Sequence, residues 1–185
     1  MELFPHPLLT IKHEPSPAIK TWLTHPRSLT EKLKKIAGKA HLQIIQEAWR
    51  KPDWWDIHAL KIEQHQIFCR EILISAHDNP CWYGRTVIPY TTYEAGWDLF
   101  LRLKGESLGN IIFGNAHIKR QVLTFYGIDK RNIEYYWLYG RLKPFTEVVW
   151  LRRSIFLLHD EFPFYLTELL LPGIKNYLDE NSSLS

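Results

Sequence analysis

Two pairs of apolar segments, each pair joined by a short polar turn, restrict the fold of this chain most strongly. The first pair, residues 66–76 and 81–89, flanks the sequence HDNP, and the second, residues 145–159 and 164–171, flanks DEFP. Such runs, rich in branched and aromatic residues and separated by turn-forming residues, predict two β-hairpins. Residues 41–49 predict a further strand. A chain with several hairpins is expected to build an antiparallel sheet.

Two short helices are predicted before the first strand. Pro17 suits the first turn of a helix, which must end before Pro26. Ser28 and Glu31 then have the spacing of a capping box, in which the two side chains cap each other's backbone N–H groups. Gly38 is suited to the position just after this second helix. The chain therefore opens with two helices joined by a tight turn.

Further helices are predicted between the hairpins. Residues 94–104 have a helical pattern that ends at Gly105, and Ser107 is suited to cap a short helix over 108–113. Residues 51–64 are predicted to form a loop or an irregular segment. Hairpins with helices to one side indicate an α+β fold. The length of 185 residues indicates one domain over residues 1–185.

Composition excludes several classes of protein. The chain is 45 % hydrophobic and 23 % charged, as expected of a soluble globular protein. It has no apolar run of about 18 residues and no basic, apolar leader, so neither a transmembrane helix nor a signal peptide is predicted. Cys69 and Cys81 do not face each other in the predicted hairpin and are expected to be reduced thiols. We therefore expect a cytoplasmic protein without membrane insertion.

The net charge of +3 suits an anionic ligand better than nucleic acid. The densest basic run, Lys32, Lys34 and Lys35, is expected to be a solvated helix face, and no nucleic-acid-binding motif is present. The nine histidines do not form the HExxH zinc motif, and two isolated cysteines do not make a zinc site. No phosphate-binding loop, dinucleotide fingerprint or nucleophile elbow is present. No metal or organic cofactor is expected.

Two charged residues fall on apolar strand faces. Alternate residues of a strand point to the same side, so Arg70 and Glu168 each share a face with three apolar residues. Those neighbours are Phe68, Ile72 and Ile74 for Arg70, and Phe164, Leu166 and Leu170 for Glu168. Removing a charge from water is costly unless the group is paired. The two residues therefore pair with each other, face solvent at the strand ends, or line a pocket for an anionic ligand.

The pocket hypothesis suits the chemistry of both side chains. The guanidinium of Arg70 can donate two parallel hydrogen bonds to a carboxylate, and a carboxyl group such as Glu168 in an apolar pocket suits proton transfer. The helices predicted to begin at Leu29 and Leu108 add unpaired backbone N–H groups, which bind carboxylates readily. Each is also compatible with an ordinary helix start. The sequence does not show whether the fold brings these elements together.

Three further arginines are candidates for the same pocket. Arg85 shares a strand face with Val87. Arg152 and Arg153 are adjacent and must point to opposite faces of their strand, so that one could face the pocket and the other water. A surface salt bridge is the alternative for each of the three.

Five motifs that contain these residues resemble the chorismate pyruvate-lyase family. They occur in the order found in that family, and the early segments WL and SLT are similar as well. The motifs are CREIL at 69–73, GRTVIP at 84–89, SLGNIIF at 107–113, RRS at 152–154 and LTELLLP at 166–172. Each motif is modest by itself, but five in order are specific. The resemblance covers residues 16–173.

This resemblance implies a single α+β domain with a six-stranded antiparallel sheet and two helix-turn-helix flaps over a buried ligand. It implies that Arg70 and the backbone N–H groups of Leu29 and Leu108 hold the ring carboxylate of chorismate. Glu168 would meet the ring hydroxyl, and Arg85 would lie near the site or its access path. The implied reaction gives 4-hydroxybenzoate and pyruvate in bacterial ubiquinone biosynthesis, and a monomer is expected.

Three points stay open at the level of sequence. Either Arg85 or Arg152 is expected to steady the enolpyruvyl carboxylate of chorismate. Residues 116–145 look longer than the family needs and predict an added helix or an extended flap. The same fold also serves bacterial transcription regulators as a non-catalytic effector-binding domain for small acids, so fold alone does not establish catalysis.

Overall fold

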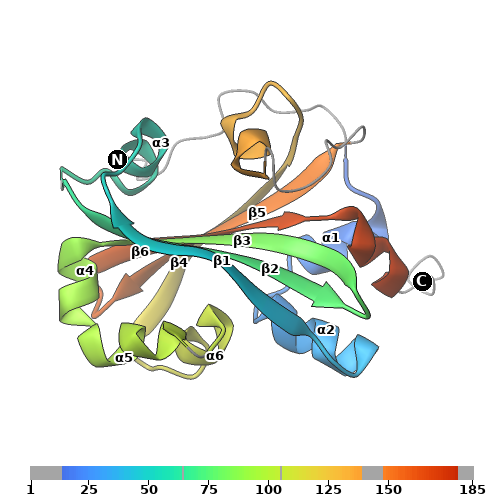
Figure 1. Ribbon diagram of the computed structural model, residues 1–185, viewed down its shortest axis with the longest axis horizontal. Coiled ribbons are helices and arrows are strands. Elements are labelled where there is room, and N and C mark those ends of the chain that lie inside the picture. Colours follow the sequence, from blue (N-terminus) through green and yellow to red (C-terminus); the bar gives the residue numbers. More distant parts are fainter. Residues whose placement is uncertain (1–13, 64, 105, 139–147, 179–185) are drawn as a thin grey trace.

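A computed structural model describes residues 14–63, 65–104, 106–138 and 148–178. Its framework is one antiparallel sheet of six strands in the order β1-β2-β3-β6-β5-β4 (Figure 1). The strands are β1 (His41–Arg50), β2 (Ile67–Ala76), β3 (Asn79–Pro89), β4 (Ile118–Ile128), β5 (Val149–Leu158) and β6 (Phe162–Leu170). The predicted α+β class and the six-stranded sheet are confirmed.

Both predicted hairpins are present, with tighter turns than the sequence suggested. His77 and Asp78 have φ of 47° and 62°, and His159 and Asp160 have φ of 54° and 60°. Positive φ at two successive residues gives the turn whose twist matches that of the flanking strands. The prolines expected in the turns, Pro80 and Pro163, instead lie within β3 and β6. The second hairpin ends where η3 (Pro172–Tyr177) begins.

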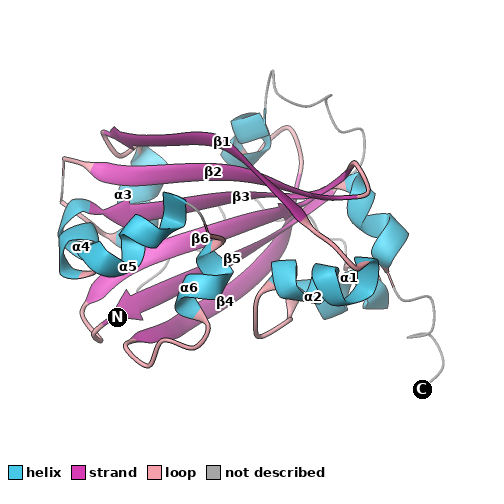
Figure 2. Cartoon of the chain, turned by 60° about the horizontal axis from the view of Figure 1, so that its bottom comes forward, coloured by secondary structure: helices cyan, strands magenta, loops and turns pink. Residues whose placement is uncertain are grey.

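Helices cover both faces of the sheet, with five α-helices on one face and α3 and η2 on the other (Figures 1 and 2). On the first face lie α1 (Pro17–Leu23), α2 (Leu29–Ala37), α4 (Tyr90–Ala95), α5 (Trp97–Leu101) and α6 (Leu108–Ile112). On the opposite face lie α3 (Trp54–Leu60) and η2 (Ile133–Leu138), the orange segment of Figure 1. The sheet thus has a buried layer on each side, and we call the side of the five helices the helix face.

The helix predicted over residues 94–104 is divided in the structure. It begins earlier, with α4 at Tyr90, and continues as α5 and the short η1 (Arg102–Lys104). Gly96 joins α4 and α5, and a Cβ atom there would lie 2.7 Å from both Leu158 and Phe100. Any side chain at this joint would force Leu158 and Phe100 to move. Gly105, the predicted end of the helix, lies outside the described residues.

Helix α3 corrects the prediction of a loop over residues 51–64. Asp53 caps it, because its Oδ1 accepts from the backbone N–H of Asp56 at 2.8 Å while Asp56 Oδ2 accepts from that of Asp53 at 3.1 Å. This is a capping box with aspartate at both positions. The helix has only seven residues, so it lacks the repeated apolar spacing by which a longer helix is detected.

Strand β4 corrects the prediction of an added helix or flap over residues 116–145. It forms an edge of the sheet and pairs with β5 over its whole length. A register shift between Arg120 and Val122 interrupts its alternation, which explains why no strand pattern was visible. The later part of the stretch contains η2, and residues 139–147 lie outside the description.

The two layers have separate apolar cores. Trp22, Leu33 and Trp82 pack on the helix face, whereas Tyr83 and Leu169 pack on the opposite face. Cys69 and Cys81 are both buried and free, as predicted. Within the described residues, no helix is both long enough and apolar enough to span a membrane.

Candidate active site

A small cavity of about 20 Å³ lies between the helix face of the sheet and the N-terminal ends of α2 and α6. Its lining combines the predicted site motifs. The lining residues are Ser28, Thr30, Ile72, Trp82, Gly84, Ser107, Leu108, Gly109, Phe113, Arg152, Leu166 and Glu168. This volume suits about one water molecule, whereas sites for small organic ligands have about 300–1,000 Å³. A small organic ligand therefore does not fit unless the residues that line the cavity move apart.

Arg70 is not among the lining residues, but it lies on the same face of β2 as Ile72, which does line the cavity. Its side chain is only 1 % exposed, and its Nε donates to Glu47 Oε1 on β1 at 2.6 Å. Both Nη atoms are buried, and no hydrogen-bond acceptor contacts them in the described part of the chain. Burial lowers the pKa of Arg70, and the hydrogen bond and charge of Glu47 act in the opposite direction. Two parallel donors without partners are suited to a carboxylate.

Glu168 lines the cavity from β6, where Arg152 of β5 is its cross-strand partner. Arg152 Nε donates to Glu168 Oε2 at 2.5 Å, and no other side chain of the described residues forms an ion pair with Glu168. Arg152 also donates to backbone carbonyls of the turn between α1 and α2, including that of His25 at 2.8 Å. Arg152 therefore fixes both Glu168 and the turn that precedes α2.

The geometry excludes the two simple explanations for the charges on apolar faces. Arg70 and Glu168 do not pair with each other, because Glu47 holds the first and Arg152 holds the second. Neither Arg70 nor Glu168 faces solvent at a strand end, since both side chains are buried. Gly84 of β3 lies between Ile72 and Glu168 in the sheet and lines the cavity. A Cβ atom on Gly84 would approach Ile72 Cγ1 to 3.0 Å.

The N-terminal ends of α2 and α6 meet over this part of the sheet. Ser28 Oγ accepts from the backbone N–H of Glu31 at 3.3 Å, and Ser107 Oγ accepts from that of Asn110 at 3.4 Å, so both predicted serine caps are confirmed. Leu108 lines the cavity. Leu29 stands between two lining residues, and its own side chain packs in the core. The fold thus brings together the two helix ends and the strand that carries Glu168.

Arg85 does not belong to this cavity. It points to the opposite face of the sheet, where its Nη1 pairs with Asp56 Oδ1 at 2.8 Å and also contacts the hydroxyl of Tyr165. Its guanidinium stacks on Trp137, with 4.5 Å between the guanidinium carbon and the ring centroid. The expectation that Arg85 lies near the substrate is therefore not supported. Strand alternation shows that Arg85 and Gly84 point to opposite sides of the sheet. It cannot show which of these two residues is on the side of the ligand.

The position of Arg153 also differs from the prediction. It lies on the opposite face from Arg152, as alternation predicts, but it is 1 % exposed and does not face water. Its guanidinium lies over Trp55 of α3, with 5.4 Å between the guanidinium carbon and the ring centroid. The helix α3, which the sequence did not reveal, covers this arginine.

A profile of the chorismate lyase family matches residues 10–179. The chain belongs to this family. A probable chorismate pyruvate-lyase from Aromatoleum aromaticum is 25 % identical and spans 94 % of this chain and 97 % of the relative. One from Coxiella burnetii is 30 % identical over 84 % of this chain and 83 % of the relative. A chorismate pyruvate-lyase from Serratia proteamaculans is 28 % identical, with coverages of 94 % and 90 %.

Solved structures that resemble this member of the chorismate lyase family include bacterial transcription regulators. A GntR-family regulator from Bacillus cereus superposes with a TM-score of 0.55 at 17 % identity, covering 72 % of this chain and 92 % of the regulator. The C-terminal domain of the histidine utilization repressor from Pseudomonas syringae gives 0.55 at 9 % identity, with coverages of 73 % and 93 %. These similarities concern the fold alone.

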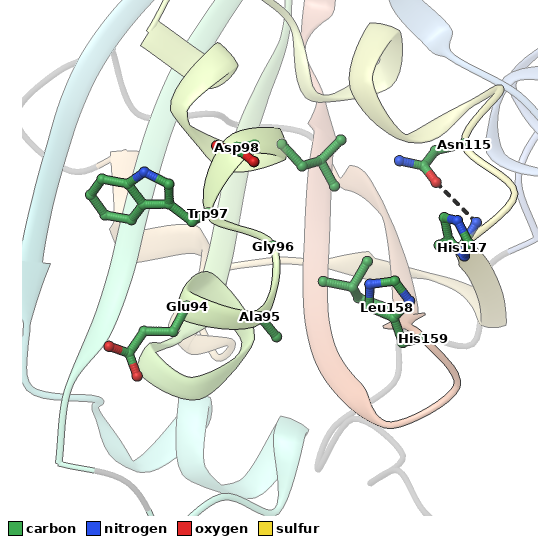
Figure 3. Close-up of a pocket in the computed structure, with 10 residues that line it drawn as sticks. Glu94, Ala95, Gly96, Trp97, Asp98, Asn115, His117, Leu158 and His159 are labelled. Carbon is green, nitrogen blue, oxygen red and sulfur yellow. Dashed lines mark hydrogen bonds between the residues drawn. The ribbon is translucent and has the colours of Figure 1, made fainter.

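A second hollow, of about 260 Å³, opens at the surface between α4–α5 and the β5–β6 turn (Figure 3). Glu94, Asp98, His117 and His159 line it, and the two imidazole centroids are 4.9 Å apart. Its carboxylates make it unsuited to the dianion that this family cleaves. No group of three or more potential metal ligands occurs within the described ranges. The enclosed cavity under α2 and α6 is therefore the candidate active site.

Gly109 sets how closely the two helix ends approach. A Cβ atom there would lie 2.5 Å from Ser28 Oγ and 2.9 Å from Ser28 Cβ. We expect Gly109→Ala to lower the free energy of unfolding by about 1–3 kcal/mol in urea titrations, because overpacking outweighs the better helix propensity of alanine. In a Ser28→Ala background the same change should cost less. Strictly additive effects of the two changes would contradict a contact between the helices.

Proposed function

We propose that this protein is a chorismate pyruvate-lyase, which converts chorismate to 4-hydroxybenzoate and pyruvate. One observation supports this function most directly. The buried Nη atoms of Arg70, without partners in the described residues, lie on the same sheet face as the arginine-held carboxylate of Glu168. An acid with a hydroxyl at the other end of its ring matches both groups. Family membership over most of the chain points to the same substrate.

In the proposed complex, Arg70 and the backbone N–H groups of Leu29 and Leu108 hold the ring carboxylate. The first N–H groups of a helix have no partner within it and lie at the positive end of its dipole. Arg70 contributes a pair of parallel donors that Glu47 orients from β1. This arrangement favours a planar carboxylate and fixes the direction in which the ring points.

The reaction needs orientation more than chemical assistance. The bond from the ring to the enolpyruvyl oxygen breaks, and the ring carbon that carries the hydroxyl loses its hydrogen. The ring becomes aromatic, and the released enolpyruvate takes up a proton to become pyruvate. No redox equivalent and no water is consumed, so the chemistry requires neither a metal nor an organic cofactor. A buried cavity favours this cleavage because it holds a reactive conformer and excludes water.

Glu168 is proposed to hydrogen-bond the ring hydroxyl and to assist the proton movement during bond cleavage. Arg152, once a candidate for binding the enolpyruvyl carboxylate, already donates to Glu168 and to the turn before α2. It is therefore proposed as the residue that positions Glu168. The protein is further proposed to act as a monomer in the cytoplasm of a bacterium, at the entry to ubiquinone biosynthesis.

The decisive assay is incubation of the purified protein with chorismate in a buffer without metal or cofactor. Equal amounts of 4-hydroxybenzoate and pyruvate, measured by chromatography, would establish the lyase. The likeness of the fold to that of transcription regulators motivates the alternative of a non-catalytic binding domain. Binding of 4-hydroxybenzoate without any turnover of chorismate would favour that alternative.

Replacing Glu168 should reduce turnover more than binding. We expect Glu168→Gln and Glu168→Ala to lower kcat by about 100- to 10,000-fold, the usual contribution of a general acid or base, while the Kd of 4-hydroxybenzoate changes far less. Glu168→Gln keeps a hydrogen-bond acceptor for Arg152, which limits the loss of stability. Glu161→Ala, at the exposed hairpin turn, is the control. An unchanged kcat in Glu168→Ala would exclude the proposed role.

A further inference from the structure

Chorismate carries a second carboxylate, on its enolpyruvyl group, and neither of the two expected arginines is available to it. Arg85 points away from the cavity and pairs with Asp56. Arg152 faces the cavity, but its nitrogens already have acceptors. They are Glu168 and the backbone carbonyls of Trp22, His25 and Arg27. A different cation must compensate the second negative charge when the substrate is buried.

Arg120 reaches the helix face because of an irregularity in β4. Arg120 pairs with Phe156 of β5, whereas Val122 pairs with Ile155, so one extra residue separates the two pairs. Beyond this bulge the residues of the helix face are odd-numbered, as in Phe125, which packs in the same core as Trp22. In a regular strand Arg120 would point to the opposite face. The bulge therefore redirects this arginine toward the cavity.

The surroundings of Arg120 place its guanidinium beside the cavity. Its central carbon lies 5.1 Å from the ring centroid of Phe113, which lines the cavity, and 5.3 Å from that of Phe156. Its Nη1 donates to the carbonyl of Pro26 at 2.8 Å. Its Nε and Nη2 are buried, and in the described segments no acceptor contacts them. One edge of the guanidinium thus keeps two parallel donors.

Ser154 offers a third donor on the same face. It lies on β5 between Arg152 and Phe156, the residues that hold Glu168 and support Arg120. Ser154 is 0 % exposed, and its hydroxyl has no hydrogen-bond partner among the residues that the structure describes. A buried hydroxyl without a partner is costly in a folded protein, and a bound ligand can supply that partner.

Electrostatics also favour an anion beside Arg120. Burial, followed by the positive charge of Arg152, lowers the pKa of Arg120 to about 10, while Glu168 acts in the opposite direction. Arg120 is thus close enough to sense both residues of the Arg152–Glu168 pair. A negative charge next to Arg120 would offset the repulsion between the two guanidinium groups.

We propose that Arg120 and Ser154 form a second anion subsite that binds the enolpyruvyl carboxylate of chorismate, a role that rests on the proposed lyase function. Arg70 then holds one end of the dianion and Arg120 the other, with Glu168 between them. Once the carbon–oxygen bond breaks, the carboxylate at Arg120 belongs to pyruvate. The aromatic product has no group for this subsite, so Arg120 distinguishes substrate from product.

The test compares one ligand that carries the second carboxylate with one that lacks it. We expect Arg120→Gln to lower kcat/KM for chorismate by at least about 30-fold, as for loss of a buried charged hydrogen bond. The Kd of 4-hydroxybenzoate, measured by calorimetry, should stay within about twofold of the wild type, because the product carries no group for Arg120. Arg120→Lys keeps the positive charge but not the planar pair of N–H donors. It should therefore recover part of the lost kcat/KM. Lys119→Gln removes an exposed charge from the adjacent position of β4 and is the matched control.

Ser154→Ala provides a second variant that should fold normally, because it removes one oxygen atom. We expect this variant to lower kcat/KM for chorismate by about 10-fold and to leave the Kd of 4-hydroxybenzoate unchanged. Unaltered kcat/KM for chorismate in Arg120→Gln, or equal losses for both ligands, would overturn the second subsite and leave the lyase assignment intact. If the wild type bound chorismate without cleaving it, the lyase function would fail. In that case the Kd values of chorismate and 4-hydroxybenzoate would still test the second subsite.

Discussion

Arg70→Ala is expected to weaken binding of 4-hydroxybenzoate by about 2–5 kcal/mol, or roughly 30- to 5,000-fold, with a matching loss of kcat/KM for chorismate. Arg70 is 1 % exposed, and its two Nη atoms have no acceptor in the described part of the protein. Its loss would leave a carboxylate in the cavity without its charge partner, since a backbone N–H group alone carries only a partial charge. Calorimetry with the product measures the effect directly.

Two further variants separate the contribution of charge from that of geometry. Arg70→Lys keeps the positive charge but loses the planar fork, so it should fall between the wild type and Arg70→Ala. Arg102→Ala removes an exposed arginine whose ion-pair partner is Glu106, four residues further on, and this variant should bind 4-hydroxybenzoate normally. Because Arg70→Ala also removes the partner of Glu47, its unfolding should be measured alongside. Normal product affinity in Arg70→Ala would rule out the proposed carboxylate site.

The parts of the fold that the sequence predicted are those with local signals. The hairpins have turn residues between strongly apolar strands, and α2 has a serine cap and a terminal glycine. These features depend on contacts within a few residues, and the structure confirms them. The strand order could not be predicted in this way, because β3 pairs with β6 although residues such as Val87 and Tyr165 are 78 positions apart in the sequence. Only the family resemblance indicated how many strands the sheet contains.

Alternation along the strands located Arg70 and Glu168, since a charge on an apolar face requires an explanation. It could not decide between the two faces of the sheet, because both faces are buried. That is why Arg85, which also alternates with apolar residues, was expected near the ligand, although it lies on the opposite face of the sheet from the cavity. It belongs to a buried network with Asp56 and Tyr165 on the far face. Asp56 lies on a helix too short to be detected from its pattern.

Arg120 and Glu47 were missed for a related reason. Each lies on an edge strand with a register shift, between Arg120 and Val122 in β4 and between Ile44 and Gln46 in β1. A bulge moves the residues that follow it to the other face of the sheet. A strict two-residue alternation of side chains therefore assigns these residues to the wrong side. The pairing of Glu47 with Arg70 on β2 would have been a usable signal only once the register of β1 was known.

Arg70 and Arg85, which are buried on opposite faces of the sheet, differ in their hydrogen-bond partners. On the helix face, the Nη atoms of Arg70 have no partner within the described residues. On the opposite face, Arg85 has partners on both Nη atoms, because Asp56 and Tyr165 surround it. Donors without partners suit the recognition of a ligand, whereas a satisfied network stabilises the fold. Substitutions of Arg70 and of residues in the Arg85 network should therefore affect different measurements.

Asp56→Ala is expected to lower the free energy of unfolding by about 3–5 kcal/mol without changing the affinity for 4-hydroxybenzoate. Asp56 is 0 % exposed and accepts from Arg85 Nη2 at 3.2 Å, Arg50 Nη2 at 3.0 Å and Tyr165 Oη at 2.5 Å. Its removal leaves the buried charge of Arg85 without its main partner. Urea titration measures the loss. Lys119→Gln, which breaks the exposed pair of Lys119 with Asp160, should cost at most about 1 kcal/mol.

The dependence on pH gives this prediction a second test. Burial opposes ionisation of Asp56, but the charge and hydrogen bond of Arg85, together with Tyr165 and the N–H of Asp53, outweigh it and lower its pKa. An unfolded aspartate has a pKa of about 3.9, so the stabilisation is complete above that value and is lost as the pH falls through the lower pKa of the folded state. The stability difference between wild type and Asp56→Ala should therefore be constant near neutral pH and shrink below about pH 4. A difference that did not change on acidification would show that Asp56 stabilises the fold by packing and not by its charge.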